Sequence, residues 1–174
     1  MVAVASSGTA SVTLPTDRQI LIRREFDAPK HLVYRAWTTP ELIKRWWSGN
    51  QGEVTLAEVD LRVGGTWRYV AVSEGQEIAF HGEYREIVPN ERIVATEVYE
   101  GDPGDEAGAG EYPTGDDRAP VTTVTFTETD GRTTVTMLVE CVSKELRDAI
   151  VESGMEVGMQ EAWAKLEEVA KSLR

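Results

Sequence analysis

The sequence predicts an α+β fold in which a curved antiparallel sheet of seven strands packs against one long C-terminal helix. Three observations support this prediction. Apolar residues alternate with a period of two through most of residues 53–141, which is typical of strands that bury one face. Turn signals such as GG, EGQ, VPNE and DGR divide this region into segments of strand length. From residue 143 onward, apolar residues recur at helical spacing instead.

The first predicted strand follows an N-terminal tail. Residues 1–17 are expected to be disordered, and they lack the basic start, the apolar centre and the cleavage site of a signal peptide. Residues 18–26, RQILIRREF, then alternate as a strand does. We therefore expect a single domain over residues 18–174, because one hydrophobic core serves a chain of this length. The lack of signal-peptide features predicts a cytoplasmic location.

Two short helices are expected after this strand. Asp27 is placed to cap a helix that starts at Pro29, and Thr39 is placed to cap a second helix with Pro40 in its first position. Gly49 is suited to end that second helix.

The second short helix carries two adjacent tryptophans, Trp46 and Trp47. Neighbouring residues of a helix point about 100° apart, so these two rings cannot face the same core. Trp46 follows Leu42 and Ile43 at helical spacing and is predicted to be buried beneath the short helices. Trp47 is predicted to reach the opening between the long helix and the sheet, where it would form part of a cavity rim.

Six further strands are predicted in the alternating region, at about residues 53–62, 66–73, 77–87, 91–99, 121–129 and 133–141. Residues 100–120 interrupt them with a run rich in acids and glycine, which is expected to be a mobile, solvated loop. Its acids do not follow the spacing of an EF-hand, so a calcium loop is the weaker reading. A plain insertion is favoured over a lid on one cavity end.

Residues 143–173 predict the long helix, with Ser143 as its cap. It is the only predicted element large enough to cover one face of the curved sheet, which defines a helix-grip arrangement. Its apolar stripe consists of Val151, Met155, Met159, Ala162, Leu166, Val169 and Leu173, with Trp163 at the border.

Composition and charge restrict the classes of partner. The 174-residue chain has 30 acidic and 18 basic residues and a formal net charge of −12, which repels nucleic acids and anionic membranes. No apolar run has the length of a membrane span. The two histidines, His31 and His81, lack metal-ligand spacing, and no cofactor-binding or catalytic motif rises above chance. Cys141 is expected to be a buried hydrophobic residue, with a nucleophile as the alternative.

Strand parity and the helical stripe predict the residues that lie between sheet and helix. Two tyrosines among them bring hydroxyl groups that need partners, which in a cavity could be a ligand or water. The candidate ligand-binding residues are Trp47, Trp67, Tyr69, Phe80, Tyr84, Glu97, Phe126, Met137, Met155, Gly158, Met159 and Trp163.

The two glycines of the long helix and Glu97 each allow two interpretations. Gly154 and Gly158 each cost about 0.5–1 kcal/mol relative to alanine in a helix, so either a close strand or a ligand needs the space. Glu97 shares parity with Ile93 and Ala95, and in a cavity its pKa would rise, although a strand end in solvent is the simpler reading. His81 has outward parity.

Four segments resemble a known family. They are FDAPKHLVYRAWTTPELIKRWW at 26–47, DLRVGGTWRY at 60–69, HGEYREIVPNERIVAT at 81–96 and SGMEVGMQEAWAKLEEVA at 153–170. Over roughly residues 18–173 the chain resembles bacterial proteins of the activator of heat-shock protein 90 ATPase homologue family, within the START-like or SRPBCC superfamily. The resemblance implies a sheet wrapped around the C-terminal helix, with an apolar cavity that in the superfamily commonly holds lipids, polyketides or other hydrophobic molecules.

Three functional hypotheses follow. The favoured one is non-enzymatic binding, by a carrier or sensor, of a small hydrophobic ligand that is lipid- or polyketide-like. The second is an enzyme of the cyclase, dehydratase or hydrolase type that uses the same cavity. The third is a stress-response or chaperone-associated module that binds a protein partner through an exposed tryptophan and the acidic loop.

Overall fold

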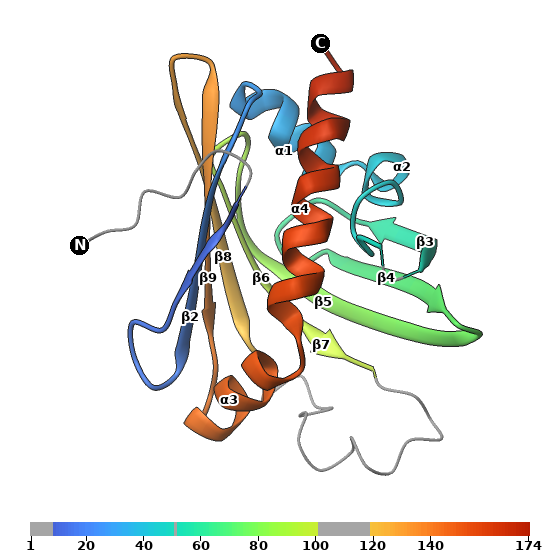
Figure 1. Ribbon diagram of the computed structural model, residues 1–174, viewed down its shortest axis with the longest axis vertical. Helices are drawn as coiled ribbons and strands as arrows, with labels where there is room; N and C mark the ends of the chain where they lie inside the picture. Colours follow the sequence, from blue (N-terminus) through green and yellow to red (C-terminus); the bar gives the residue numbers. More distant parts are fainter. Residues whose placement is uncertain (1–8, 51, 101–118) are drawn as a thin grey trace.

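The computed structural model describes residues 9–50, 52–100 and 119–174, which form one antiparallel sheet curved around a C-terminal helix (Figure 1). The strands are β1 Ser11–Thr13, β2 Gln19–Phe26, β3 Glu53–Val59, β4 Thr66–Ser73, β5 Gln76–Val88, β6 Arg92–Thr96, β7 Val98–Tyr99, β8 Val121–Thr129 and β9 Arg132–Glu140. The helices are α1 Lys30–Thr38, α2 Pro40–Ile43, α3 Lys144–Glu152 and α4 Met155–Ser172. This architecture confirms the predicted α+β helix-grip class.

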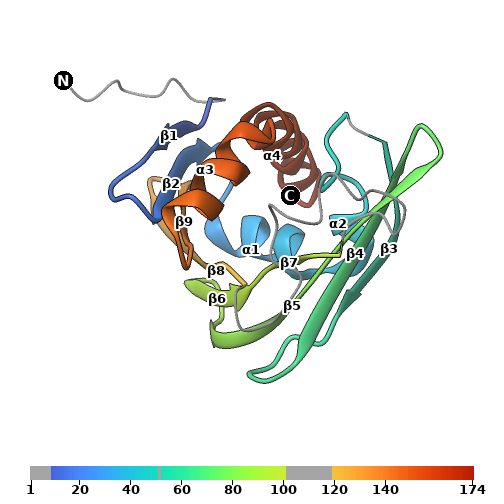
Figure 2. The same ribbon diagram turned by 90° about the horizontal axis from the view of Figure 1, so that it is seen from below.

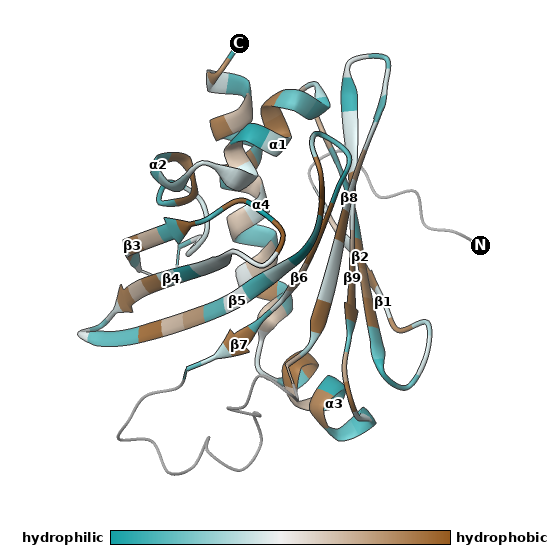
Figure 3. Cartoon of the chain, turned by 180° about the vertical axis from the view of Figure 1, so that it is seen from behind, coloured by the Kyte–Doolittle hydropathy of each residue, from teal (hydrophilic) through white to brown (hydrophobic). Residues whose placement is uncertain are grey.

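The strand order is β1-β2-β9-β8-β6-β5-β4-β3, with β7 paired to β5, and all pairs are antiparallel. Seen from below, the sheet curves strongly and α4 lies across its open side (Figure 2). In Figure 3, hydrophobic residues of β4 and β5 group near the turn that joins the two strands, at residues 70–72 and 78–80.

The described part of the sheet contains nine strands, two more than predicted. One addition is β1, which lies within the predicted disordered tail and pairs Val12 with Ile22. The Gln160 side chain of α4 holds the preceding Ala10 through both of its backbone polar groups, at 2.9 and 2.8 Å. The prediction is therefore wrong for β1, since three residues are too few to show a period and a distant helix orders them. Residues 1–8 lie outside the described residues.

The second addition comes from a break in the predicted strand at 91–99. The backbone N–H of Glu97 donates to Pro120 O at 3.1 Å, between the end of β6 and the start of β7. The acidic loop that follows was predicted at residues 100–120, and residues 101–118 lie outside the described residues.

The predicted long helix is in fact two helices. Ser143 caps α3 by accepting a hydrogen bond from the backbone N–H of Leu146 at 3.1 Å, as expected. The helix breaks at Gly154, whose φ of +86° lies in the left-handed region that favours glycine. A Cβ there would meet nothing within 4 Å, so close approach to a strand does not explain this glycine.

The start of α1 differs from the prediction in its capping residue. Asp27 was predicted to cap this helix, but the N-cap position is Pro29 and no side chain caps it. The Asp27 carboxylate lies instead 3.5 Å from Arg132 and 3.7 Å from Arg174. These two cations, brought from β9 and the C-terminus, are the tertiary contacts that draw the aspartate away from the helix.

The second short helix is anchored to α4. Pro40 occupies its first turn as predicted, although Thr39 forms no capping hydrogen bond through its side chain. Regular helix ends at Ile43 and hydrogen-bonded turns continue to Gly49, where φ is +59°. Lys165 Nζ donates to the Gly49 carbonyl at 2.6 Å, so α4 fixes the loop that carries the adjacent tryptophans.

Candidate functional site

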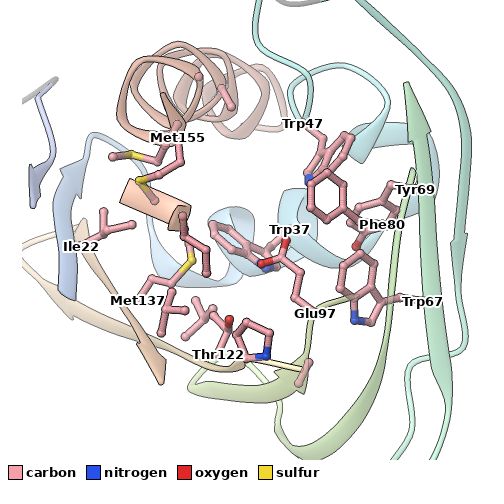
Figure 4. Close-up of a pocket in the computed structure, with 18 of the residues that line it drawn as sticks. Ile22, Trp37, Trp47, Trp67, Tyr69, Phe80, Glu97, Thr122, Met137 and Met155 are labelled. Carbon is pink, nitrogen blue, oxygen red and sulfur yellow. The ribbon is translucent and has the colours of Figure 1, made fainter. Parts of the chain in front are cut away.

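A cavity of about 400 Å3 lies between α4 and the concave face of the sheet (Figure 4). This volume falls within the range of about 300–1,000 Å3 that small-molecule sites occupy. Its described lining consists of Ile22, Trp37, Trp46, Trp47, Trp67, Tyr69, Phe80, Tyr84, Ile93, Ala95, Thr96, Glu97, Tyr99, Pro120, Thr122, Val124, Met137, Val139, Ile150, Ser153, Met155, Gly158, Met159, Ala162 and Trp163.

All five tryptophans of the chain line this cavity. Trp47 is half-buried, and its ring packs edge-on against Tyr69 and Phe80, with ring centroids 5.3 and 5.5 Å apart. Tyr69 also contacts Trp67 at 4.7 Å, and Phe80 contacts Tyr99 at 5.1 Å. We call these five residues the aromatic wall.

Backbone carbonyls hold two of the tryptophan rings in place. Trp46 Nε1 donates to Ala36 O at 2.9 Å, and Trp67 Nε1 donates to Thr96 O at 3.2 Å. A Cβ at Gly82 would lie 1.9 Å from Thr96 O and 2.5 Å from Trp67 Nε1, so this strand position requires glycine. Because each indole N–H has a partner in the protein, the rings present apolar faces to the cavity.

A second aromatic cluster closes the cavity beneath the short helices. Trp37 contacts Trp46 at 5.2 Å, Trp163 at 5.8 Å and Phe126 at 5.8 Å between ring centroids. Phe126 is 1% exposed and does not line the cavity, so its predicted place in the site is wrong. The physical reason is that Trp37, reaching across from α1, packs against Phe126, which sits in the core with Tyr34.

Every other predicted ligand-binding residue lines the cavity. Sequence reasoning missed Trp37 as a lining residue and assigned Trp46 to the core alone. The apolar spacing of α1 indicated that Trp37 would be buried, but not that its ring would face a cavity. Gly158 lines the cavity, as the ligand interpretation of this glycine requires. A Cβ at Gly158 would meet nothing within 4 Å.

The polar groups of the cavity are few. The Tyr69 and Tyr84 hydroxyls hydrogen-bond to one another, and burial raises the pKa of both residues. The hydroxyl oxygen of Thr122 is buried and has no hydrogen-bond partner among the described residues. These groups sit in a lining that is otherwise mainly aromatic and aliphatic.

Glu97 brings a carboxylate into this apolar environment. Figure 4 shows its carboxylate projecting into the cavity. Of the two positions that its strand parity allowed, inside the cavity or at a strand end in solvent, the structure supports the first. Burial raises the pKa of Glu97 from 4.5 to about 7, and no compensating charge opposes that shift. The break between β6 and β7 positions this residue, because its backbone N–H turns to Pro120.

We expect the raised pKa of Glu97 to appear as a pH dependence of stability. Below about pH 4.5 the carboxyl is protonated in the folded and the unfolded chain, so it favours neither. As the pH rises, the unfolded chain releases the proton first, and folded wild type loses stability relative to Glu97→Gln until the pH passes about 7. The loss should reach up to about 3 kcal/mol, because one pKa unit corresponds to about 1.4 kcal/mol. Urea denaturation of both proteins from pH 4.5 to 8 measures it, and parallel curves would contradict the assignment.

Other candidate groups lie away from the cavity. His81 Nδ1 lies 3.1 Å from Glu100 Oε2, and Arg68 donates two hydrogen bonds to the same carboxylate at 2.9 and 3.1 Å. His81 does not line the cavity, as its parity predicted, and neither does Arg68. Cys141 is buried and burial raises its pKa to about 11, which keeps it a thiol at neutral pH.

The described residues contain neither a cluster of metal ligands nor a membrane-spanning helix. No group of three or more histidine, cysteine, aspartate or glutamate side chains in that part of the chain could hold a metal ion. None of the helices described there is long and apolar enough to cross a membrane.

A curved antiparallel sheet around a long helix, with an apolar cavity between them, defines a protein of the helix-grip fold. The chain belongs to the family of Activator of Hsp90 ATPase homolog 1-like proteins, which it matches over residues 27–171. This match confirms the family resemblance of the sequence segments.

Solved structures share the fold. A protein from Rhodobacter sphaeroides is 23% identical with a TM-score of 0.80, and the match covers 95% of this chain and 99% of that one. A protein from Arthrobacter aurescens is 24% identical with a TM-score of 0.77, covering 93% and 91%. A protein from Chromobacterium violaceum is 26% identical with a TM-score of 0.69, covering 87% and 96%. The comparison with curated proteins finds no match.

Proposed function

We propose that the protein is a non-enzymatic carrier or sensor that binds a small hydrophobic, lipid- or polyketide-like molecule in the cavity between α4 and the sheet. The observation that carries this proposal is the convergence of all five tryptophans on that cavity. Each large aromatic side chain that faces a ligand offers apolar contact area at a low cost in conformational entropy.

The construction of the lining supports the proposal. The rings come from α1, the turn after α2, β4 and α4, and two of them are fixed by hydrogen bonds to backbone carbonyls. Met137, Met155 and Met159 line the cavity as well, and flexible thioethers adapt to ligands of varied shape. A preformed aromatic lining with adaptable methionines suits a binding protein.

One observation favours an enzyme of the cyclase, dehydratase or hydrolase type as a second candidate. Glu97 has a pKa of about 7 in the cavity, which is the range in which a carboxyl group acts well as a general acid or base. The hydrogen-bonded hydroxyls of Tyr69 and Tyr84 also belong to this cavity. The third hypothesis, a protein-binding module, relied on an exposed tryptophan and the acidic loop. The Trp47 ring is half-buried against Tyr69 and Phe80, and residues 101–118 lie outside the described residues.

The proposed function is tested by identifying what the protein carries. Native mass spectrometry of the purified protein should show a bound mass that denaturation removes, and solvent extraction should then yield a small hydrophobic molecule. Conversion of that molecule during incubation with the protein would favour the enzyme over the carrier.

Filling the cavity should block binding without unfolding the protein. A leucine at Gly158 enters open space at the cavity surface, and it replaces a helix glycine, which adds about 0.8 kcal/mol of helix propensity. We expect Gly158→Leu to weaken binding of a fluorescent naphthalene dye by about tenfold or more, because a four-carbon side chain displaces part of the ligand. Fluorescence titration measures the change.

The matched control for this variant is Val157→Leu. Val157 is the preceding residue of α4 and is 60% exposed, so a leucine there adds apolar volume outside the cavity. It should leave dye affinity unchanged. A folded Gly158→Leu protein with wild-type affinity would show that ligands do not use this part of the lining.

A further inference from the structure

The charged groups of the cavity lining indicate which class of ligand the cavity can bind. Glu97 is the only acid among the described residues that line it, and the same lining contains no lysine, arginine or histidine. A fatty-acid carboxylate placed there would meet no cation from these residues and would face a second carboxylate. Like charges in a poorly solvated site repel strongly.

The Glu97 carboxylate has no partner among the described residues. No hydrogen bond or ion pair from residues 9–50, 52–100 or 119–174 reaches it, and burial is the cause of its raised pKa. An ionised carboxylate in such a site is costly unless an opposite charge compensates it. The described lining therefore supplies one negative charge and no positive charge to compensate it.

Aromatic rings line the same cavity as this carboxylate. Figure 4 shows Glu97 projecting into the cavity, which Trp37 and the aromatic wall also line. The charge of Glu97 contributes to the raised pKa of Tyr69, so the carboxylate lies within electrostatic range of that wall. The faces of tryptophan and tyrosine rings attract cations, and tryptophan does so most strongly.

We propose that the cavity selects an organic cation, a molecule with an apolar body and one ammonium group that pairs with Glu97 and contacts the aromatic wall. This inference rests on the proposed function and names the class of its ligand. The ammonium group compensates the buried carboxylate, the rings contact its remaining faces, and the apolar body fills the rest of the lining. The net charge of −12 on the chain also attracts cations at long range.

The experiment compares probes that differ only in their head group. Isothermal titration at pH 8.5, below the micellar concentration of each probe, measures the binding of decylamine, decyltrimethylammonium, decanol and decanoate. At this pH Glu97, with its pKa of about 7, is ionised, and decylamine is protonated. We expect at least one of the two cations to bind about tenfold or more tightly than decanol, and decanoate to bind most weakly. The two cations distinguish an N–H donor from a quaternary ammonium group.

Two variants locate the origin of the preference. Glu97→Gln keeps the shape of the side chain and removes its charge, so it should abolish the preference for cations and leave decanol affinity within about twofold. Glu83→Gln is the matched control, because Glu83 is exposed on β5 and does not line the cavity. Circular dichroism checks that both variants fold.

The outcomes separate this inference from the proposed function. If decanol binds as tightly as both cations, or if folded Glu97→Gln keeps the cation preference, the inference is overturned while the hydrophobic cavity stands. Binding of the naphthalene dye without binding of any decyl probe overturns it as well. If neither the dye nor any decyl probe binds, the proposed function itself fails and the inference with it.

Discussion

Replacing Trp46 by alanine is expected to lower the free energy of unfolding by about 3–5 kcal/mol, because this ring is a core element. Trp46 is 5% exposed, packs against Trp37 and donates a hydrogen bond to Ala36 O. Truncation would leave a cavity beneath α1 and an unpaired carbonyl. Trp46→Phe, which keeps a ring but loses the N–H donor, should cost less and so separates packing from hydrogen bonding.

Replacing Trp47 by alanine is expected to cost much less stability and more ligand affinity. Its ring is half-buried, and its described ring contacts are with Tyr69 and Phe80, at the surface where a ligand would lie. Urea denaturation of both tryptophan variants, with matched dye titrations, measures the two rankings. The assignment fails if Trp47→Ala is the more destabilising change or leaves dye affinity untouched.

Replacing Arg24 by alanine is expected to lower the free energy of unfolding by about 3–5 kcal/mol, because it breaks a buried charge pair that joins β2 to α4. Arg24 is 3% exposed, donates to Trp163 O at 3.0 Å and lies 3.6 Å from Glu167 Oε1. Its guanidinium carbon also lies 4.5 Å from the centre of the Phe26 ring. Desolvation by burial lowers the pKa of Arg24, and Glu167 opposes that shift.

Two further variants make the Arg24 result interpretable. Arg23→Ala removes the exposed arginine next to it on β2 and should change stability by less than about 0.5 kcal/mol. Arg24→Met keeps most of the apolar stem and should recover part of the loss. Urea denaturation at neutral pH measures all three. An Arg24→Ala protein as stable as Arg23→Ala would show that the buried guanidinium does not hold α4 to the sheet.

Elements with a local signal could be predicted from the amino-acid sequence. Strands β4 and β8 begin and end at the predicted residues, because alternation over eight or nine residues is a strong period-two signal. The capping Ser143 and the first-turn Pro40 were also predictable, since each acts through its own helix end. Parity along the strands similarly predicted that Trp67, Tyr69, Phe80, Tyr84 and Met137 line the cavity, because side chains alternate across a sheet wherever it lies.

Tertiary structure decided the features that depend on distant partners. The backbone of Ala10 is ordered by Gln160, and Asp27 is drawn from its predicted capping role by Arg132 and Arg174. Phe126 has the parity of a lining residue, but Trp37 comes from another element to pack against it, and parity carries no information about depth. The turn of Glu97 toward Pro120 likewise joins segments separated by the acidic loop. Local pattern therefore specified which face each side chain takes. Packing between elements decided which of those faces enclose a cavity and where Glu97 lies within it.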